Sequence, residues 1–333
     1  MLLKEIEAGV DTWDVYLSTS KAASIFHQAD WLTIIQTNQN LELIKLGLYD
    51  NGVLIGLLPL YVKNIGIMRI ASSPFYVEDS PYMGFVFDEN VDVNDVIGSV
   101  FSYMKLNRIN FVRFVQQQYY ANVRSNKFVK TIEKHTHVLK LDKSVDELWR
   151  NLEGRCRTAV RKAEKCGIKV SFVFDVQVVH LYYQMLTEVY GCQQLIYPHP
   201  RDFFIDIFNK FNGSQLYMLV ARLDEEIIAG GIFLVDKETV YYLNGASRRE
   251  YNNTGVNNLI QWKSIQHAHE LGKLYYDFVG SDMARFGKFK KSFGGDVQRN
   301  QCIEITDSHL TAIIRRWYPV IKRVTMKYLK QRI

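Results

Sequence analysis

One predicted helix carries a row of cationic side chains whose type and spacing could do chemistry. Between Ser144 and Gly167, apolar residues recur every three or four positions and gather on one side. The opposite side carries Arg150, Arg155, Arg157, Arg161, Lys162 and Lys165. Guanidinium groups bind phosphate oxygens bidentately, so this stripe suits an anionic, phosphate-bearing substrate. The alternative is a solvated face that only aids solubility, and spacing alone leaves both open.

Specific end signals position this helix. Ser144 and Glu147 form a capping box, in which hydroxyl and carboxylate bind exposed amides of the first turn. Gly167 suits the left-handed residue that follows a last turn. The sequence therefore predicts one continuous helix from Ser144 to near Gly167.

A weak internal repeat organises the rest of the chain. Residues 48–60 and 222–234 both consist of an apolar run, a short polar turn and a second apolar run. Asp50 matches Asp224, and Gly56 matches Gly230. Because Asn51-Gly52 is a typical turn between antiparallel strands, each half is expected to contain a β-hairpin.

Each hairpin is followed by a predicted helix and a further strand. The helices span residues 96–106 and 259–271, and the strands span residues 110–115 and 274–279. An antiparallel meander followed by a helix and a parallel strand is the layout of the GNAT fold. We therefore predict an α/β protein with mixed sheets, built as tandem GNAT-like lobes with a cleft between them. The predicted divisions are residues 1–135, 136–308 and a basic tail, 309–333.

Composition indicates a folded protein. The chain has 333 residues, of which 47% are hydrophobic and only six are proline, so it can form two cores without disordered segments. The acidic amino-terminal segment does not resemble a signal peptide, which predicts a cytoplasmic location. Its four cysteines show no CxxC spacing, so neither a zinc site nor a disulfide framework is expected.

The end of the chain is strongly basic. After Asp307 there is no acidic residue, whereas seven cations follow: Arg315, Arg316, Lys322, Arg323, Lys327, Lys330 and Arg332. Apolar residues alternate with them at roughly helical spacing, which is typical of an amphipathic helix on an anionic membrane. The tail is therefore compatible with peripheral contact at the inner face of the membrane or with an acidic partner. The alternative is a terminal helix packed on the body with a solvated basic face.

Several motifs carry a resemblance to a known family. Residues 157–168 match the pattern R-x-x-[IV]-R-[KR]-A-x-x-x-G-[IV], and Phe26 to Trp31 adds a match in the first half. Further matches follow in order at residues 221–231, 241–247, 276–280 and 289–295. Together they resemble the FemAB-like acyltransferases of bacterial cell-wall synthesis, within the GNAT superfamily.

The resemblance implies transfer of an acyl or aminoacyl group to an amine, commonly on a cell-envelope or polysaccharide precursor. The donor would be aminoacyl-tRNA or acyl-coenzyme A, with no tightly bound cofactor, no metal and no DNA partner. Coenzyme A enzymes of the superfamily usually carry [RQ]-x-x-G-x-[GA], whose amides bind pyrophosphate. Here only Gly255 of that pattern is present, with Asn252 and Asn257 at its ends. This departure favours aminoacyl-tRNA or a divergent acyl donor without excluding coenzyme A, and Gly255 remains a candidate binding residue.

The resemblance also suggests site residues. The lysine of its F-K-x-x-F-G motif lies near the donor carbonyl, which makes Lys290 the expected oxyanion donor and Lys291 the fallback. Asp277 and Asp282 lie near the same motif and could accept the amine proton. For the acceptor phosphate, the candidates are Arg155, Arg157, Arg161 and Arg201.

Two rival functions stay open at this point. One is a coenzyme A dependent N-acyltransferase that acts on an amino sugar or small amine. The other is a non-catalytic module that binds an anionic ligand or a membrane through the basic helix and tail. The first rival needs coenzyme A binding, and the second needs no oxyanion donor, so Lys290 would be dispensable.

Overall fold

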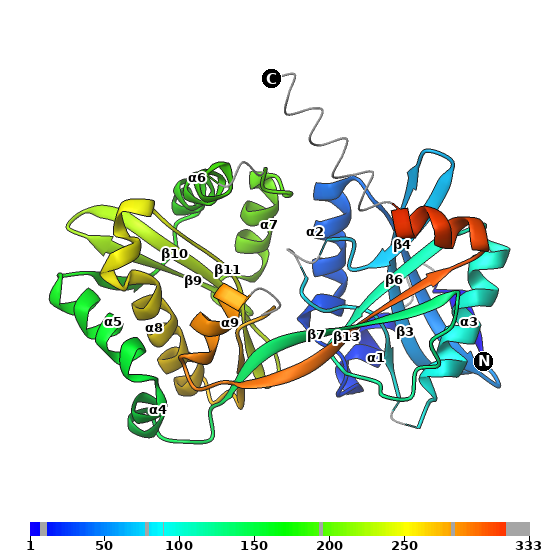
Figure 1. Ribbon diagram of the computed structural model, residues 1–333, viewed down its shortest axis with the longest axis horizontal. Helices are drawn as coiled ribbons and strands as arrows, with labels where there is room; N and C mark the ends of the chain where they lie inside the picture. The colour runs from blue at the N-terminus through cyan, green and yellow to red at the C-terminus, as the bar shows by residue number, and fades with distance from the viewer. Residues whose placement is uncertain (7–11, 77–79, 89, 193–195, 281–283, 318–333) are drawn as a thin grey trace.

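The computed structural model of the protein describes residues 1–6, 12–76, 80–88, 90–192, 196–280 and 284–317. Its framework is one mixed sheet of 13 strands, in the order β1-β2-β3-β4-β6-β13-β7-β12-β11-β10-β9-β8, with β5 paired to β3. Helices lie against both faces of this sheet, and the two halves of the chain form two lobes (Figure 1). The mixed α/β class predicted from the sequence is confirmed.

The first half contains the predicted hairpin and its continuation. Strands β2 (Glu42–Asp50) and β3 (Val53–Ile65) are antiparallel, and Asn51 and Gly52 between them both have positive φ. Strand β4 (Met68–Ser73) then pairs in parallel with β6 (Phe111–Gln116) across helix α3 (Val93–Leu106). The remaining elements are β1 (Leu2–Glu5), α1 (Thr12–Thr19), the 3-10 turn η1 (Ile25–His27), α2 (Ala29–Gln39) and β5 (Val86–Phe87).

The second half repeats this arrangement. Strands β9 (Leu216–Leu223) and β10 (Glu226–Val235) form the hairpin, with Asp224 at φ 51°. Strand β11 (Thr239–Ser247) pairs in parallel with β12 (Tyr275–Asp277) across helix α8 (Val256–Glu270). Before and around them lie β8 (Lys169–Phe172), α6 (Gln177–Gly191), α7 (Arg201–Phe211) and the 3-10 turn η2 (Arg249–Thr254).

The two lobes share strands at the centre of the sheet. Strand β7 (Val129–Lys140) spans the junction of the two halves in sequence and pairs through Val138 to Lys140 with β12 of the second half. Strand β13 (Asp296–Thr306) comes from the second half but pairs with β6 of the first. The two strands also pair with each other, and they run together through the middle of Figure 1. The division proposed at residues 135 and 136 thus falls inside β7 rather than in a linker.

The basic helix differs from its prediction. It is two helices, α4 (Val145–Asn151) and α5 (Gly154–Lys165), because Leu152 and Glu153 adopt extended backbone angles with ψ near 145°. The Leu152 side chain is buried, and the Glu153 amide donates to the Ser292 carbonyl at 2.9 Å. This tertiary contact outside the helix breaks it. The capping box at Ser144 is present as predicted.

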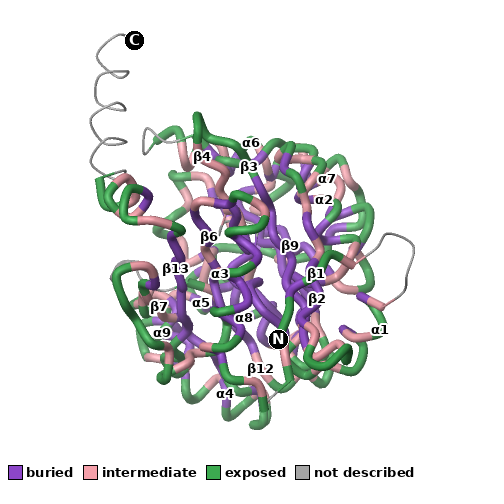
Figure 2. Tube along the Cα trace, turned by 90° about the vertical axis from the view of Figure 1, so that its right-hand side faces the viewer, coloured by how far each residue is buried: buried purple, intermediate pink, exposed green. Residues whose placement is uncertain are grey.

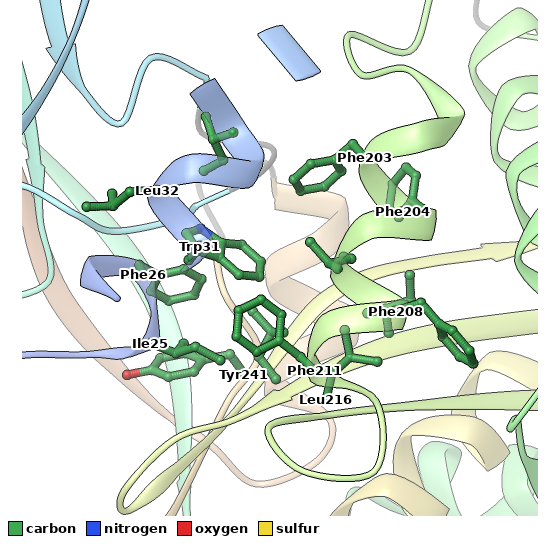
Figure 3. Packing of buried hydrophobic residues seen from close by; sticks show 14 of the residues in the cluster. Ile25, Phe26, Trp31, Leu32, Phe203, Phe204, Phe208, Phe211, Leu216 and Tyr241 are labelled. Carbon is green, nitrogen blue, oxygen red and sulfur yellow. The ribbon is translucent and has the colours of Figure 1, made fainter. Parts of the chain in front are cut away.

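Three apolar clusters hold the molecule together. One fills the first lobe around α3, and a second fills the other lobe between α4, α5 and α8. The third joins the lobes, because Phe26 and Trp31 of the first half pack with Phe203 and Phe211 of α7 (Figure 3). Figure 2 shows that buried backbone follows the strands through the molecule. The boundary between the lobes is therefore partly solid core.

Part of the predicted basic tail falls within the described residues. Residues 309–317 form a helix against the end of β13, whereas residues 318–333 lie outside the described part of the chain. Within the described ranges, no helix has both the length and the apolar character needed to cross a bilayer.

Candidate active site

Lys290 is the one lysine of its motif that is buried. It lies on helix α9 (Ala284–Lys291), with only 9% of its surface exposed, whereas Lys288 and Lys291 are exposed. The Lys290 ammonium donates to the carbonyls of Val279 and Gly280, just beyond the end of β12. A buried charge is costly unless it is hydrogen-bonded, and these carbonyls supply the bonds. The ammonium is thereby fixed at the strand end.

Asp277 occupies the last position of β12, on the same short segment. Its side chain is 1% exposed, and Oδ1 accepts from Thr136 Oγ1 at 2.6 Å and from the Val279 amide at 2.7 Å. Oδ2 has no hydrogen bond of good geometry within the described residues. Burial raises the pKa of Asp277 above its ordinary value, although the bonds from Thr136 and Val279 oppose this.

Val279 connects these two groups through an unusual backbone. Its φ is 54°, a left-handed value that is a genuine outlier for a β-branched residue, and Gly280 follows at 48°. In this conformation the Val279 amide donates to Asp277, while its carbonyl accepts from Lys290. Such strain persists only where surrounding contacts enforce it, and it is concentrated at functional sites.

The neighbouring strands diverge at this same point. Strands β11 and β12 pair only from Thr239 to Tyr241, opposite Tyr275 to Asp277. Beyond Asp277, the Phe278 amide donates to the His137 carbonyl of β7, so the chain follows β7. Strand β11 continues to Ser247, and no described strand pairs with it on that side past Tyr241. Past Tyr241, only the β10 side of β11 is paired with a described strand.

A cavity of about 730 Å³ reaches Asp277 from between the lobes. Its inner wall includes Tyr82 and Gln116 from the first lobe and Tyr241 and Asp277 from the second. The Tyr82 hydroxyl lies close to the Asp277 carboxyl, and burial raises the pKa of Tyr82 well above its usual range. Gln116 Nε2 is buried without a hydrogen-bond partner among the described residues. The cavity thus offers buried polar atoms to a ligand from both lobes.

The residues of the Phe26–Trp31 motif have structural roles. His27 is buried at the cavity wall, where Nε2 lies 2.9 Å from the Met83 carbonyl and Nδ1 accepts from the Ser24 amide at 3.2 Å. Burial lowers the pKa of His27 to about 4, so this histidine is neutral at physiological pH. Trp31 donates through Nε1 to Ser80 Oγ at 2.8 Å.

The structure gives the three candidate arginines of α5 partners within the protein. Arg157 donates to the carbonyls of Arg150 and Leu152 at the break between the helices. Arg155 pairs with Glu153 at 2.6 Å and donates to the Lys288 carbonyl at 3.0 Å. The Arg161 guanidinium lies 5.4 Å from the centre of the Trp149 ring. Arg155 thus joins α5 to the Lys290 helix, whereas Arg157 mainly satisfies carbonyls left free by the end of α4.

Two further candidates lie elsewhere, and one lies outside the described residues. Arg201 is the first residue of α7, 3.6 Å from Asp202, and lines a separate cavity of about 490 Å³ with Tyr183. Gly255 has φ 87°, and a Cβ there would lie 2.2 Å from the Ala159 carbonyl oxygen of α5. Close packing of α5 and α8 therefore requires this glycine. Asp282 lies outside the described residues.

Sequence reasoning missed three residues of this site. Thr136 lies on β7, in the segment that was interpreted as a lobe boundary, and Tyr82 lies in a connection without a motif. Val279 is part of the matched segment 276–280, yet nothing in its residue type predicts a left-handed backbone. Thr136 and Tyr82 reach Asp277 from distant parts of the chain, which local patterns do not reveal, whereas Val279 lies only two residues beyond Asp277.

The fold and site together define a two-lobed protein with the GNAT fold. Residues 150–291 match the family model for the "Acetyltransferase (GNAT) domain". Over 113 residues the chain is 32% identical to "Aminoacyltransferase FemA" from Staphylococcus epidermidis. This match covers 31% of the chain and 25% of FemA, so the chain spans about a quarter of its curated relative.

Solved structures extend the likeness to the whole fold. FemX superposes with a TM-score of 0.69 at 15% identity, covering 94% of this chain and 100% of FemX. A tandem GNAT protein from the clavulanic acid biosynthesis pathway gives 0.56 at 10% identity, covering 92% and 98% of the two chains. L-PGS from Bacillus licheniformis gives 0.55 at 12% identity, covering 98% and 99%. Part of the chain thus resembles the GNAT domain model and FemA, and the whole chain shares the fold of FemX, in line with the resemblance that its motifs carry.

Proposed function

We propose that the protein is an acyltransferase that passes an acyl or aminoacyl group from an activated carrier to an amine. The amine nitrogen attacks the carrier's ester or thioester carbonyl directly, without a covalent enzyme intermediate. A C–N bond forms, the bond from the carbonyl carbon to the carrier oxygen or sulfur breaks, and the amine proton passes on to that leaving atom. This reaction class fits the GNAT domain match and the similarity to FemA.

The observation that carries the proposal is the arrangement at the end of β12. A buried ammonium and a buried carboxylate bind opposite sides of one strained residue, Val279, where β11 and β12 diverge. Attack on a carbonyl develops negative charge on its oxygen, and a preorganised cation stabilises that charge best in a site sheltered from water. Lys290 would supply this stabilisation, helped by amides on the side of β11 that β12 leaves past Tyr241.

Asp277 would act on the attacking amine. This residue lines the cavity between the lobes, through which the amine end of the acceptor would approach, and its Oδ2 has no hydrogen-bond partner of good geometry among the described residues. A carboxylate whose pKa is raised by burial is a stronger base, and therefore accepts a proton from the attacking nitrogen more readily. The acceptor would be an amine-bearing cell-envelope or polysaccharide precursor, by analogy with the FemAB-like family.

The loop before α8 bears on the choice of donor. In this protein the Ala159 carbonyl packs against Gly255, and Lys162 donates to the Asn253 carbonyl at 2.7 Å. Asn252 and Asn257 both hydrogen-bond to Ser247. Helix α5 thus covers the place where a pyrophosphate would meet the start of a helix. This favours aminoacyl-tRNA over coenzyme A as the carrier.

The proposed role of Lys290 is tested by Lys290→Met, with Lys288→Met as the matched control. Loss of an oxyanion donor elsewhere costs about a hundredfold or more in kcat, and we expect a loss of that size here. Lys288 is exposed and lies outside the proposed machinery, so its variant should retain activity. Turnover would be measured with aminoacyl-tRNA and a pool of amine-bearing envelope precursors. Unchanged activity in Lys290→Met would remove the assignment, and a loss in Lys291→Met alone would move it to the fallback lysine.

The donor is tested separately by isothermal titration. We expect charged tRNA to bind and acetyl-coenzyme A to give no heat at micromolar protein. Micromolar binding of acetyl-coenzyme A would instead support the coenzyme A dependent alternative and leave the role of Lys290 intact.

A further inference from the structure

Exposed apolar side chains gather at one end of the first lobe, away from the candidate site. They come from three segments: the β3–β4 turn, the end of α3 and the helix at residues 309–317. We call this set the apolar pole; its members are Ile65, Ile67, Leu106, Leu310, Ile313 and Trp317. Ile67 is 96% exposed and Leu106 is 83% exposed. Side chains of this size are seldom exposed together on a protein that has no partner there.

Hydrogen bonds through Asn110 hold the three segments side by side. The Asn110 amide donates to the Arg69 carbonyl at 2.8 Å, next to the β3–β4 turn. Asn110 Nδ2 donates to Asp307 Oδ2 at 2.8 Å, and the Asp307 amide donates back to the Asn110 carbonyl. Arg69 also reaches the Asn107 carbonyl, directly after α3. These bonds hold the three segments that carry the apolar pole at one end of the first lobe.

The helix at residues 309–317 turns its apolar side outward. Its inner side is held by Thr311, which is 4% exposed and donates to Asp307 at 2.6 Å, and by Arg315, which pairs with Glu304 at 2.5 Å. Leu310, Ile313 and Trp317 recur three and four positions apart and so share the opposite side. A terminal helix that only covered the body would bury these three residues instead. Figure 1 shows this helix in red beside the β3–β4 hairpin.

Positive charge surrounds the apolar pole. Exposed cations lie on or next to its segments: Lys63, Arg108, Lys127 and Arg316. Among the acidic residues near it, Glu42 binds Arg69 at 2.9 Å and Glu304 binds Arg315, while the exposed carboxylate of Asp307 accepts hydrogen bonds from Asn110 and Thr311. The sequence beyond Trp317 adds five further cations and no acid. Apolar side chains with a cationic border match a membrane whose headgroups are anionic.

We propose that the apolar pole is a peripheral membrane site that docks on an anionic lipid surface. The apolar side chains enter the boundary between headgroups and acyl chains, while the surrounding cations bind the phosphates. A nucleic acid would also attract the cations, but it gives no reason to expose Ile67, Leu106 and Leu310. The proposal is independent of the transfer chemistry, since no residue of the apolar pole belongs to the candidate active site.

The test is flotation of the full chain with vesicles. We expect binding to vesicles of phosphatidylglycerol and phosphatidylcholine, and little binding to phosphatidylcholine alone. The double variant Ile67→Ser, Leu310→Ser should lower the partition coefficient about tenfold or more. Each substitution removes an aliphatic side chain that the bilayer would bury. Arg108→Gln should lower it about fivefold, as expected for one cation at an anionic surface. Salt at about 1 M should release the protein.

The matched control changes exposed apolar residues that lie away from the pole. Val53 is 64% exposed at the opposite end of β3, and Phe174 is 81% exposed in the second lobe. Val53→Ser, Phe174→Ser should bind vesicles like the wild type, and circular dichroism melts would confirm that both double variants fold. The proposal is overturned if the wild type does not bind anionic vesicles or binds neutral vesicles equally well. It is also overturned if the control double variant loses as much vesicle binding as the variant of the apolar pole. If the protein binds RNA but not vesicles, the cations belong to a nucleic-acid site, and the membrane proposal is overturned as well.

Discussion

Asp277 is the residue of the candidate site whose chemistry depends most on its surroundings. Because burial raises its pKa above the usual 3.8, the folded protein keeps this proton at pH values where the unfolded chain releases it. Its contribution to stability is therefore complete below about pH 4 and is lost as pH rises through the folded-state pKa. The same shift makes the carboxylate a better base, so activity and stability place opposite demands on this residue.

We predict that Asp277→Asn separates these two demands. The amide cannot ionise, so the fall in unfolding free energy with rising pH should become shallower, as measured by urea unfolding from about pH 4 to pH 8. Transferase activity should fall, and the acid limb of the kcat/KM profile should disappear if Asp277 accepts the amine proton.

Asp296 provides the comparison for this experiment, because it is an exposed carboxylate at the start of β13. Asp296→Asn should leave both the stability slope and the acid limb as in the wild type. If the acid limb persists in Asp277→Asn, another group accepts the amine proton. Asp277 would then have only a structural role, as hydrogen-bond acceptor for Thr136 and the Val279 amide.

At the scale of elements, helices α5 and α8 meet more closely than side chains permit. The contact depends on Gly255, where a Cβ would lie 2.2 Å from the Ala159 carbonyl oxygen and 2.8 Å from its carbon. Both are backbone atoms, so the two helices themselves would have to separate. The conformational requirement, φ 87°, adds to this steric one.

We predict that Gly255→Ala lowers the free energy of unfolding by about 3 kcal/mol, through overpacking together with backbone strain. Gly167→Ala is the matched control, because Gly167 has a similar φ of 79° but nothing within 4 Å of its added Cβ. It should cost only about 1 kcal/mol, the backbone term alone. If urea melts show equal losses of unfolding free energy in the two variants, α5 and α8 can separate at little cost in stability. The loop before α8 could then bind a pyrophosphate.

The same elements show what could be predicted from the sequence. Hairpins and parallel strands follow local signals, such as Asn51-Gly52 and the alternation of helix and strand, and these predictions are confirmed. The break between α4 and α5 was not predictable, because the Glu153 amide bonds to Ser292, far away in the sequence. Burial of Lys290 but not Lys288 likewise depends on the position of β12. The motif identified the site segment, whereas tertiary contacts decide which side chain turns inward.

At the scale of the whole molecule, the lobes depend on each other. Strand β6 of the first lobe has β13 as its neighbour, with Ile303 opposite Phe114. Removing β13 would leave the edge of β6 unpaired, and removing the second half would expose Phe26 and Trp31, which are fully buried. The predicted division into residues 1–135 and 136–308 describes a repeat in the sequence, and the pairing argues against two units that fold independently.

We predict that residues 1–135 alone do not fold cooperatively. The fragment would keep most of its own core but lose its central neighbouring strand and the cluster between the lobes, and unpaired apolar edges promote aggregation. Thermal unfolding by circular dichroism should show a broad transition or none, whereas the full chain should unfold in one step. Co-expression with residues 136–333 should rescue the fragment and copurify both, because the second half supplies β13, the strand that β6 of the fragment lacks. If the fragment alone unfolds in one sharp transition, the first lobe folds independently. The pairing of β13 with β6 would then only join two domains that are each stable alone.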